Sequence, residues 1–511
     1  MKICSSNGFA TNSFLAALIH LAFLNPANAN TWFIGSTQTY TVPGQIMNLV
    51  SDGDTIYING GVYTNDATKW INSDLKFIGL GTGANRTILR NTGNIPNHKG
   101  IFVFETPGTC DNAYIENIVF DGAQVSDADG ANGAGIRFQA NNLTVKNCKF
   151  INCQNGILEG NASVNTSNVF IQNCEFENNG YQLPNDPNHS GYEHHIYISA
   201  SADTLLVMNN WFHHPRGQAN SIKTRAQRSF ILYNFIDEEA SGYGSWEINI
   251  AQGGLNIVIG NIIIQAASAA NHGIIGYDAA TNPIEDFYFV NNTVINKYVG
   301  NASYFNIAPA GGIDSFKVYN NIFASIAGAN MTFINGNMPG GLDTSNNSFS
   351  GDYLAYGFVD PSTGDFRLMA NALLAIDRGT NAGMTNTSSD LNPSFMYQSF
   401  STSLLARQTY GGALDLGAYE YETPTSIEKN GLNKDVFIYP NPTSGKCRII
   451  FQDEQFDLTH LQIFDLCGKS VFTGNFTGIN IDLDLSGNAN GIYLLKTTGP
   501  TESFNKKILL R

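Results

Sequence analysis

The chain is short of charge, and the charge it has is mostly negative. Charged residues make up 14% of the 511 residues, with 27 Lys and Arg against 42 Asp and Glu, which gives a net charge of −15. So acidic a chain, without a Gly-rich phosphate loop, is not expected to bind nucleic acid or a nucleotide cofactor. It also lacks segments with apolar residues at helical spacing, because Gly and Asn interrupt nearly every candidate. With 42% apolar residues it is not disordered, and short strands joined by many turns fit best.

Long hydrophobic runs are missing except near the start of the chain. Phe14–Leu24 is apolar but too short to span a membrane. Lys2 precedes this run, and Ala27–Ala29 follows it with small residues suited to cleavage, so residues 1–29 are predicted to be a secretory signal peptide. No other stretch is apolar for long enough to form a transmembrane helix. The protein is therefore expected to be exported.

What the sequence does have is internal repetition. LTVKNCKF (Leu143–Phe150) and VFIQNCEF (Val169–Phe176) each read as a short alternating strand, an Asn and a second apolar strand. Nine Asn residues align in this way, at steps of 24 to 37 residues: Asn117, Asn147, Asn173, Asn210, Asn234, Asn261, Asn292, Asn321 and Asn347. Such a unit buries its apolar face only by stacking on its neighbours, so we predict an all-β fold with a right-handed parallel β-helix over residues 30–422. Asn suits the bend between strands because it tolerates the left-handed conformation, and stacked amides can bond from turn to turn.

Cysteine is scarce, with seven in the chain. Cys148 and Cys174 lie one repeat apart, and we expect them to be small apolar core residues, not reactive thiols. The spacings do not match a zinc site. Export permits disulfides, but nothing in the sequence fixes their pairing.

The character of the chain changes near its end. A small β-rich unit there contains YPNPTSG (Tyr439–Gly445) and LQIFDLCGKSV (Leu461–Val471). This order of motifs resembles the C-terminal sorting domain of the type IX secretion system of Bacteroidota. The resemblance implies a small β-sandwich over residues 430–511 after a linker at 423–429, handling by the type IX machinery, and a secreted or cell-surface location. A generic immunoglobulin-like module is the alternative.

One part of the predicted coil stands out by its insertion and its cations. The longest repeat step holds an excess of roughly ten residues, near Tyr181–His195, and insertions into solenoids become loops on one face, often the binding face. One turn later, SIKTRAQRS (Ser221–Ser229) concentrates cations in an otherwise acidic chain. Strand alternation predicts that HHIYIS, SIKTR and SWEINI, one turn apart, present six side chains on one external surface: His195, Tyr197, Lys223, Arg225, Glu247 and Asn249.

These residue types suit the cleavage of an acidic polysaccharide by β-elimination. The reaction needs a cation on the uronate carboxylate, a base at C5 and an acid near the leaving oxygen. Arg225 is the candidate cation and Lys223 the candidate base, because a neighbouring Arg lowers the pKa of a Lys. His195 is an alternative base, and Tyr197 is a candidate proton donor. Seven further positions are expected to contact substrate: His194, His213, His214, Arg216, Arg228, Glu247 and Asn249.

The repeats and this cluster resemble β-helix polysaccharide lyases of the pectate lyase and chondroitinase-like superfamily. Those families use exposed Lys, Arg or His on a β-helix face, sometimes with calcium, so a role for calcium stays open. The dense aspartate cluster of calcium-dependent pectate lyases is missing. So are the paired-Asp and Gly-His-Gly motifs of polygalacturonase-type hydrolases. The resemblance implies a secreted lyase, expected to be monomeric, that acts on an acidic polysaccharide.

Other functions stay open at this stage. A non-catalytic adhesin or glycan-binding protein would share the fold and the export signals, but it needs no preorganised base. A uronate epimerase shares the proton-abstraction step with a lyase. A glycoside hydrolase needs two carboxylates that face each other, and Glu247 is the only strong carboxylate of the predicted surface. The sequence does not choose between alginate, pectin and a glycosaminoglycan as the polymer.

Overall fold

The computed structural model divides the chain into two compact units, with the boundary between Glu422 and Thr423. The predicted signal segment up to residue 28, the predicted linker, most of the predicted inserted loop, Cys4 and Cys467 lie outside the described residues. The structure describes residues 29–510 except 106–107, 182–190, 279–280, 309–311, 399–403, 423–435, 440, 442, 452–458, 466–468, 477–479 and 499–502.

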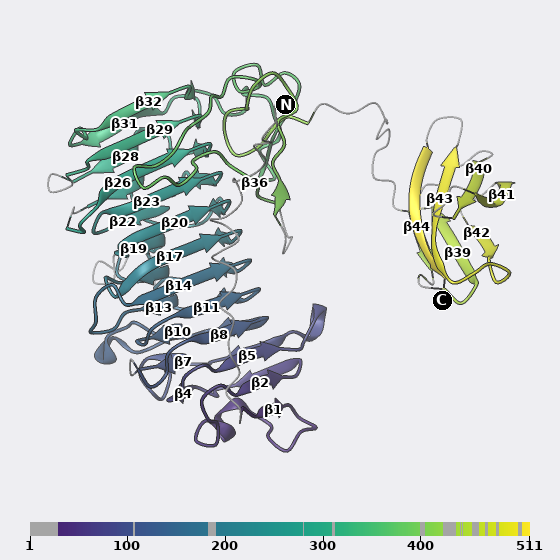
Figure 1. The fold of residues 1–511 in the computed structure, drawn as a ribbon, viewed down its shortest axis with the longest axis horizontal. Helices are drawn as coiled ribbons and strands as arrows, with labels where there is room; N and C mark the ends of the chain where they lie inside the picture. Colours follow the sequence, from purple (N-terminus) through teal and green to yellow (C-terminus); the bar gives the residue numbers. More distant parts are fainter. Residues whose placement is uncertain are drawn as a thin grey trace, which may run out of the picture. The chain divides into compact units, whose positions relative to one another are not determined.

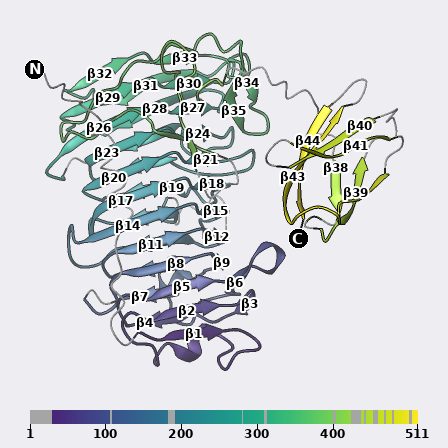
Figure 2. The same cartoon turned by 45° about the vertical axis from the view of Figure 1, so that its right-hand side comes forward.

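The first unit is a right-handed parallel β-helix, as predicted, and its turns stack to form three long parallel sheets (Figures 1 and 2). The twelve-stranded sheet contains β1 (Thr31–Ile34), β2 (Thr55–Ile58), β5 (Lys76–Gly79), β8 (Ala113–Glu116), β11 (Leu143–Lys146), β14 (Ser167–Gln172), β17 (Ala202–Met208), β20 (Arg228–Leu232), β23 (Gly254–Ile259), β26 (Glu285–Val290), β29 (Ser315–Tyr319) and β32 (Leu342–Ser345). The eleven-stranded sheet contains β3 (Gly61–Thr64), β6 (Thr87–Arg90), β9 (Ile118–Asp121), β12 (Lys149–Ile151), β15 (Glu175–Glu177), β18 (Trp211–His213), β21 (Phe235–Asp237), β24 (Ile262–Gln265), β27 (Thr293–Asn296), β30 (Ile322–Ser325) and β33 (Ser348–Ser350). The ten-stranded sheet contains β4 (Thr68–Trp70), β7 (Gly100–Phe104), β10 (Ala134–Phe138), β13 (Asn155–Glu159), β16 (His194–Ile198), β19 (Asn220–Thr224), β22 (Ile248–Ile250), β25 (Gly273–Tyr277), β28 (Asn301–Ile307) and β31 (Asn330–Gly336). Three short 3-10 turns lie between strands, at Pro43–Ile46, Gly83–Asn85 and Asp127–Asp129.

Aromatic side chains stack along the inside of the coil. Phe120, Phe150, Phe176 and Phe212 are register partners on successive strands, and their ring centroids lie 5.1, 4.9 and 4.7 Å apart. All four rings are fully buried. Because the stacking distance equals the spacing of neighbouring strands, ring packing and backbone pairing fix the same register.

The predicted use of Asn at the bend is confirmed, but two neighbouring positions share it. Asn117, Asn147 and Asn173 occupy the left-handed conformation, with φ of 57°, 53° and 56°. In later turns the left-handed residue is the one before the aligned Asn, such as Asn209. The aligned side chains then form a ladder that is buried as far as Asn321. From Asn234 on, each Oδ1 accepts from the backbone N–H and the Nδ2 of the preceding Asn, in the order Asn210, Asn234, Asn261, Asn292, Asn321 and Asn347.

Cysteines occupy the ladder position in earlier turns. Cys148 and Cys174 are buried, as predicted, and the backbone N–H of Cys174 donates to Asn210 Oδ1 at 2.8 Å, where the ladder begins. Together with Cys153 and Cys447 they are free thiols in the described part of the chain.

The end of the first unit, residues 353–421, folds back over two of the three faces. Its apolar side chains pack on outward residues of the eleven-stranded sheet, such as Ile264 and Ile295. They also pack on outward residues of the twelve-stranded sheet, such as Ile257 and Tyr288. This closing segment contains the strand pairs β34 (Phe358–Asp360) with β35 (Asp365–Leu368) and β36 (Phe395–Met396) with β37 (Leu405–Ala406). Among the described residues, neither cluster includes the ten-stranded sheet, so the outer face of that sheet stays open.

The second unit is a small sandwich of two antiparallel sheets, as predicted. Its buried core includes Ile449, Leu461, Ile463, Leu495 and Ile508. Within the described residues, no helix is long and apolar enough to cross a bilayer. One sheet contains β38 (Val436–Tyr439), β39 (Lys446–Phe451) and β42 (Asn480–Asp484), and the other contains β41 (Ser470–Phe476), β40 (Thr459–Phe464), β43 (Gly491–Thr498) and β44 (Ser503–Leu510).

Candidate functional site

A column of outward-facing side chains runs along the ten-stranded sheet. Its members are register partners on β10, β13, β16, β19 and β22, in the order Arg137, Leu158, Tyr197, Lys223 and Asn249. Neighbouring members are one strand spacing, about 4.8 Å, apart. The predicted offset of 26 residues that aligns Tyr197 with Lys223 is therefore confirmed. The predicted offset of 24 residues that aligns Lys223 with Glu247 is wrong, because Lys223 pairs with Asn249.

A cleft of about 560 Å³ opens over this column, and we call it the cationic cleft. It brings together four of the predicted site residues: His194, Tyr197, Lys223 and Arg225. Gly191–Glu193, near the end of the predicted inserted loop, also line it. The remaining lining residues are Gly130, Ala131, Asn132, Arg137, Asn155 and Leu158.

The cations of the cleft are held without carboxylate partners. Burial lowers the pKa of Lys223, and the nearby Arg225 guanidinium lowers it further. Arg225 Nε is buried and has no hydrogen-bond partner among the described residues. Within the same residues, no carboxylate lies within 4.0 Å of the charged groups of Arg137, Lys223 or Arg225. An anionic ligand would therefore meet cations that form no ion pair with the described residues.

His194 is held as a neutral ring of defined tautomer. Burial lowers its pKa well below the usual value, with Lys223 as the next cause. The backbone N–H of Asn220 donates to Nδ1 at 3.4 Å, so the neutral ring carries its proton on Nε2. The ring stacks on Tyr197, with centroids 5.6 Å apart. His194 is thus suited to donate a hydrogen bond and to orient Tyr197, not to abstract a proton.

The predictions that His195 and Glu247 face outward are wrong. Both are fully buried inside the coil. His195 packs edge-on against Phe176, and its Nδ1 lies 3.0 Å from Asn179 Nδ2. Burial raises the pKa of Glu247 well above its usual value, with Glu238 as the next cause. Neither side chain lines the cleft, so neither is placed to act as base or substrate ligand there.

The physical reason is that the alternation of inward and outward side chains fails near the start of each strand, where the chain turns the corner from the previous sheet. His195 and Ile196 both point inward, as do Glu247 and Ile248. The corner turns two consecutive residues toward the axis before the outward position is reached. An added Cβ at the equivalent Gly156 would come within 2.9 Å of the Phe176 ring, which shows the same inward direction.

Four further predicted substrate contacts lie away from the cleft. His213 is buried on β18 of the eleven-stranded sheet and stacks on Trp211. His214 has a left-handed backbone and faces Glu239, 3.5 Å away. Arg216 lies in the following loop and donates to the carbonyl oxygen of Gly180 at 3.3 Å. Arg228 starts β20 on the twelve-stranded sheet and pairs with Asp203. The expected cluster is thus divided over three faces.

The cationic cleft does not fit calcium. Calcium takes six to eight oxygen ligands, but Glu193 is the only carboxylate among the described residues that line the cleft. Among the described residues, one group has metal-ligand spacing, and it consists of Glu175, Glu177 and His213 on the eleven-stranded sheet. The Lys149 ammonium already lies 2.8 Å from Glu175 and 2.5 Å from Glu177.

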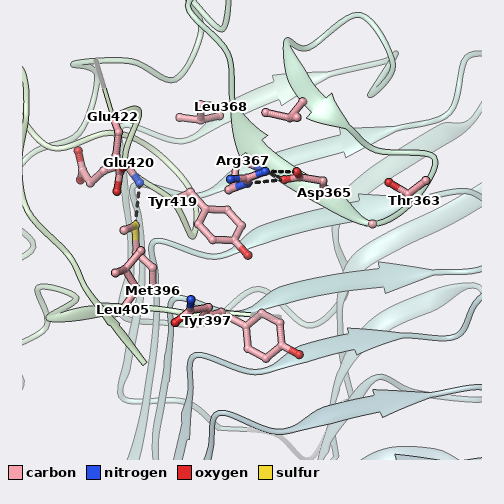
Figure 3. A pocket seen from close by; sticks show the side chains of 13 residues that line it. Thr363, Asp365, Arg367, Leu368, Met396, Tyr397, Leu405, Tyr419, Glu420 and Glu422 are labelled. Carbon is pink, nitrogen blue, oxygen red and sulfur yellow. Dashed lines mark hydrogen bonds and ion pairs between the residues drawn. The ribbon is translucent and has the colours of Figure 1, made fainter. Parts of the chain in front are cut away.

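Another hollow, of about 540 Å³, lies where the closing segment covers the eleven-stranded sheet (Figure 3). Arg367 Nε donates to Asp365 Oδ1 at 2.8 Å, so the cation in its wall is neutralised. The Tyr397 ring stacks on Phe235 of β21, with centroids 5.6 Å apart. These contacts join the closing segment to the coil, and we do not place the functional site here.

Sequence reasoning missed Arg137 and Glu193. Arg137 was available from the register, because GIRF (Gly135–Phe138) aligns with HIYI (His195–Ile198) two turns on. Glu193 lies within the predicted inserted loop, just before β16, so no strand alternation predicted its place. Its side chain is 2% exposed and lines the cleft.

Two comparisons with known proteins bear on the chain. Residues 437–511 match the family model of the secretion system C-terminal sorting domain. The predicted type IX sorting domain is therefore confirmed, and it indicates a protein that is secreted or displayed at the cell surface. A search of curated proteins finds no match to the chain.

Proposed function

We propose that the β-helix unit is a polysaccharide lyase that cleaves a uronate-containing polymer in the cationic cleft. One observation carries this proposal. Lys223, with a lowered pKa, lies beside the buried and unpartnered Nε of Arg225 on an open sheet face. A base beside an unneutralised cation is what proton abstraction next to a carboxylate requires.

In this mechanism the uronate carboxylate binds the Arg225 guanidinium, which makes the C5 proton more acidic. The neutral amine of Lys223 takes that proton. The electron pair of the C5–H bond forms the C4=C5 double bond while the C4–O4 bond breaks. Tyr197 donates its hydroxyl proton to the leaving oxygen, and His194 holds the ring of Tyr197 in place. Arg137, on the other side of Tyr197 from Lys223, binds the carboxylate of a second uronate.

The test is the appearance of the unsaturated product by ultraviolet absorbance. The full chain is incubated with alginate, polygalacturonate, hyaluronan, chondroitin sulfate and heparan sulfate, each with calcium and with a chelator. Absorbance is expected to rise with at least one polymer, in both conditions. Lys223→Ala and Arg225→Ala should each lose roughly 10² to 10⁴ in rate.

Arg228→Ala is the matched control, because Arg228 belongs to the same cationic segment but lies on the twelve-stranded sheet. It should keep full activity. If polymers bind without cleavage, the unit is a glycan-binding protein instead. If solvent deuterium enters C5 without a double bond, the unit is an epimerase. Equal loss in all three variants would overturn the cleft as the site.

A further inference from the structure

A second cleft opens on the same open face of the ten-stranded sheet. It measures about 530 Å³, and we call it the amide cleft. It is lined by Ala270, Asn271, His272, Gly273, Asn301, Ala302, Ser303, Asn306, Thr332 and Asn335. None of these lining residues is a Lys, Arg, Asp or Glu. The cationic cleft, by contrast, holds Arg137, Lys223, Arg225 and Glu193.

Backbone pairing places the two clefts on one line. The outward column continues from Lys223 through Asn249 and Gly276 to Asn306 and Asn335. Asn306 is three turns beyond Lys223, a distance of about 14 Å at the usual strand spacing. One turn is about as high as one sugar unit is long (~5 Å). A glycan that follows the column therefore presents one unit to each turn.

An aromatic platform lies between the clefts. A Cβ added at Gly273 would come within 2.5 Å of Trp246 Cζ3, and one added at Gly276 would come within 3.0 Å of Cδ2. The indole thus lies across the two glycines, which leave room for it on the sheet. Trp246 is half-buried, so part of the ring remains exposed. Beside it, His272 stacks on Tyr298, with centroids 3.8 Å apart. Such a surface matches the C–H face of a pyranose ring.

An unused polar atom lies on the same line. Asn249 is 4% exposed, and its Oδ1 has no hydrogen-bond partner among the described residues. It sits in the outward column between Lys223 and Gly276. A buried acceptor without a partner is costly, and the hydroxyl or acetamido N–H of a sugar would satisfy it.

We propose that the amide cleft and Trp246 bind uncharged sugar units of the chain that is cleaved in the cationic cleft. This inference rests on the proposed function and specifies its substrate class. The substrate is a heteropolysaccharide that contains neutral or N-acetylated sugars together with uronates, not a homopolymer of uronate. A homopolyuronate would bring carboxylates against amides and an indole, with no cation to replace the lost water.

The test is binding without turnover. The full chain carries Tyr197→Phe, which keeps every cation of the cleft but removes the proposed proton donor. Calorimetry compares oligogalacturonate with hyaluronan and chondroitin oligosaccharides of equal length. The mixed oligosaccharides should bind at least about tenfold more tightly. Trp246→Phe and Asn306→Ala should each reduce this preference. Thr144→Ala, on the outer face of the twelve-stranded sheet, should leave it unchanged.

The outcomes separate this inference from the lyase proposal. Three results would overturn the amide cleft as a sugar site. Oligogalacturonate could bind as tightly as the mixed oligosaccharides or more tightly, the preference could survive both substitutions, or no oligosaccharide could bind at all. A preference for mixed oligosaccharides without any unsaturated product from the wild type would overturn the lyase and leave the sugar site standing. If polygalacturonate is cleaved as fast as the mixed polymers, the lyase proposal stands and the proposed preference for uncharged sugars is overturned.

Discussion

The Lys223 ammonium lies 5.8 Å from the centre of the Tyr197 ring, because the two residues are register partners on β19 and β16. The candidate base and the candidate proton donor are therefore held side by side by backbone pairing, not by a loop. A site built on paired strands keeps its geometry when the polymer binds. The arrangement also makes the protonation of Lys223 sensitive to its neighbours.

The first prediction concerns this protonation. Burial and Arg225 lower the pKa of Lys223, and only the neutral amine acts as a base, so kcat/KM should rise as pH rises through that lowered pKa. Arg225→Gln removes one of the two causes, so the rising limb should move to higher pH. The pH profile of the residual kcat/KM measures the shift. Arg228→Gln should leave the limb in place. An unmoved limb in Arg225→Gln would exclude Lys223 as the base.

The second prediction separates the two adjacent histidines. His194→Gln should lower kcat by roughly tenfold or more while the melting temperature changes little, since the ring only orients Tyr197. His195→Gln should lower the melting temperature, because the ring packs inside the coil against Phe176 and Phe212. Its kcat per folded molecule should stay close to that of the wild type. Loss of kcat at an unchanged melting temperature in His195→Gln would restore the sequence-based hypothesis.

The sequence predicted the coil and part of the site for a physical reason. Each repeat must pair with the next in register, so the spacing of 26 residues between Tyr197 and Lys223 correctly placed them on one column. Strict alternation failed at the corners. The residue before the first inward Ile, such as His195 or Glu247, also points inward. A rule of strict alternation places adjacent residues on opposite faces, so it predicts the wrong face for these two.

How the closing segment packs on the coil was beyond the reach of sequence reasoning. Its apolar residues are not periodic, and nothing in their spacing indicates that they cover Ile264 or Tyr288. The ten-stranded sheet stays open because the closing segment covers the other two, so this property became visible only in the structure. Arg137 and the amide cleft needed the register of the whole sheet, not that of three turns.

The third prediction tests the asparagine ladder. Asn261 Oδ1 accepts from the backbone N–H and the Nδ2 of Asn234, at 2.8 and 2.9 Å. Asn261→Ala leaves the buried backbone N–H of Asn234 and one of its two Nδ2 hydrogens without an acceptor, while the other still bonds to the carbonyl oxygen of Val207. It should lower the free energy of unfolding by roughly 3 kcal/mol. Thermal and denaturant unfolding measure it. Asn72→Ala removes only an exposed contact with Asp52 and should have little effect. Equal effects of the two changes would contradict a structural role for the ladder.

The fourth prediction concerns Glu159 on β13. Burial raises its pKa to about 7, from an ordinary value of 4.5, although Ser199 and Ser201 donate hydrogen bonds to it. The folded state thus holds its proton more tightly than the unfolded state. Stability is highest below pH 4.5 and falls as pH rises to about 7, by roughly 3 kcal/mol from this group.

Glu159→Gln removes this titration. The difference in melting temperature between pH 5 and pH 8 should therefore be smaller in the variant than in the wild type. The pKa of Glu247 is raised as well, so Glu247 contributes to the pH dependence of both proteins. The test is therefore the difference between wild type and variant in this change of melting temperature, not the change in either protein alone. An identical pH dependence in both would show that Glu159 is not protonated in the folded state.

The fifth prediction concerns the sorting domain. The cores of the two units share no residue, so a chain that ends before Thr423 should keep the melting transition of the β-helix unit. It should fail to reach the medium or the cell surface of a Bacteroidota host, because the matched residues 437–511 are lost. Cell fractionation measures the location. A reporter fused to residues 423–511 is the control and should be exported. Surface delivery of the truncated chain would contradict the role of the domain.

The ladder also bears on how such a protein can change over generations. Each rung from Asn210 to Asn347 makes the same pair of bonds with the next, so the rungs are interchangeable. A duplicated repeat inserted between two of them would keep its neighbours bonded and would lengthen the open face by one strand spacing. Duplication or loss of single repeats would therefore adjust the length of the open face, one strand spacing at a time, without any change to the turns of the cationic cleft or to the ends of the coil.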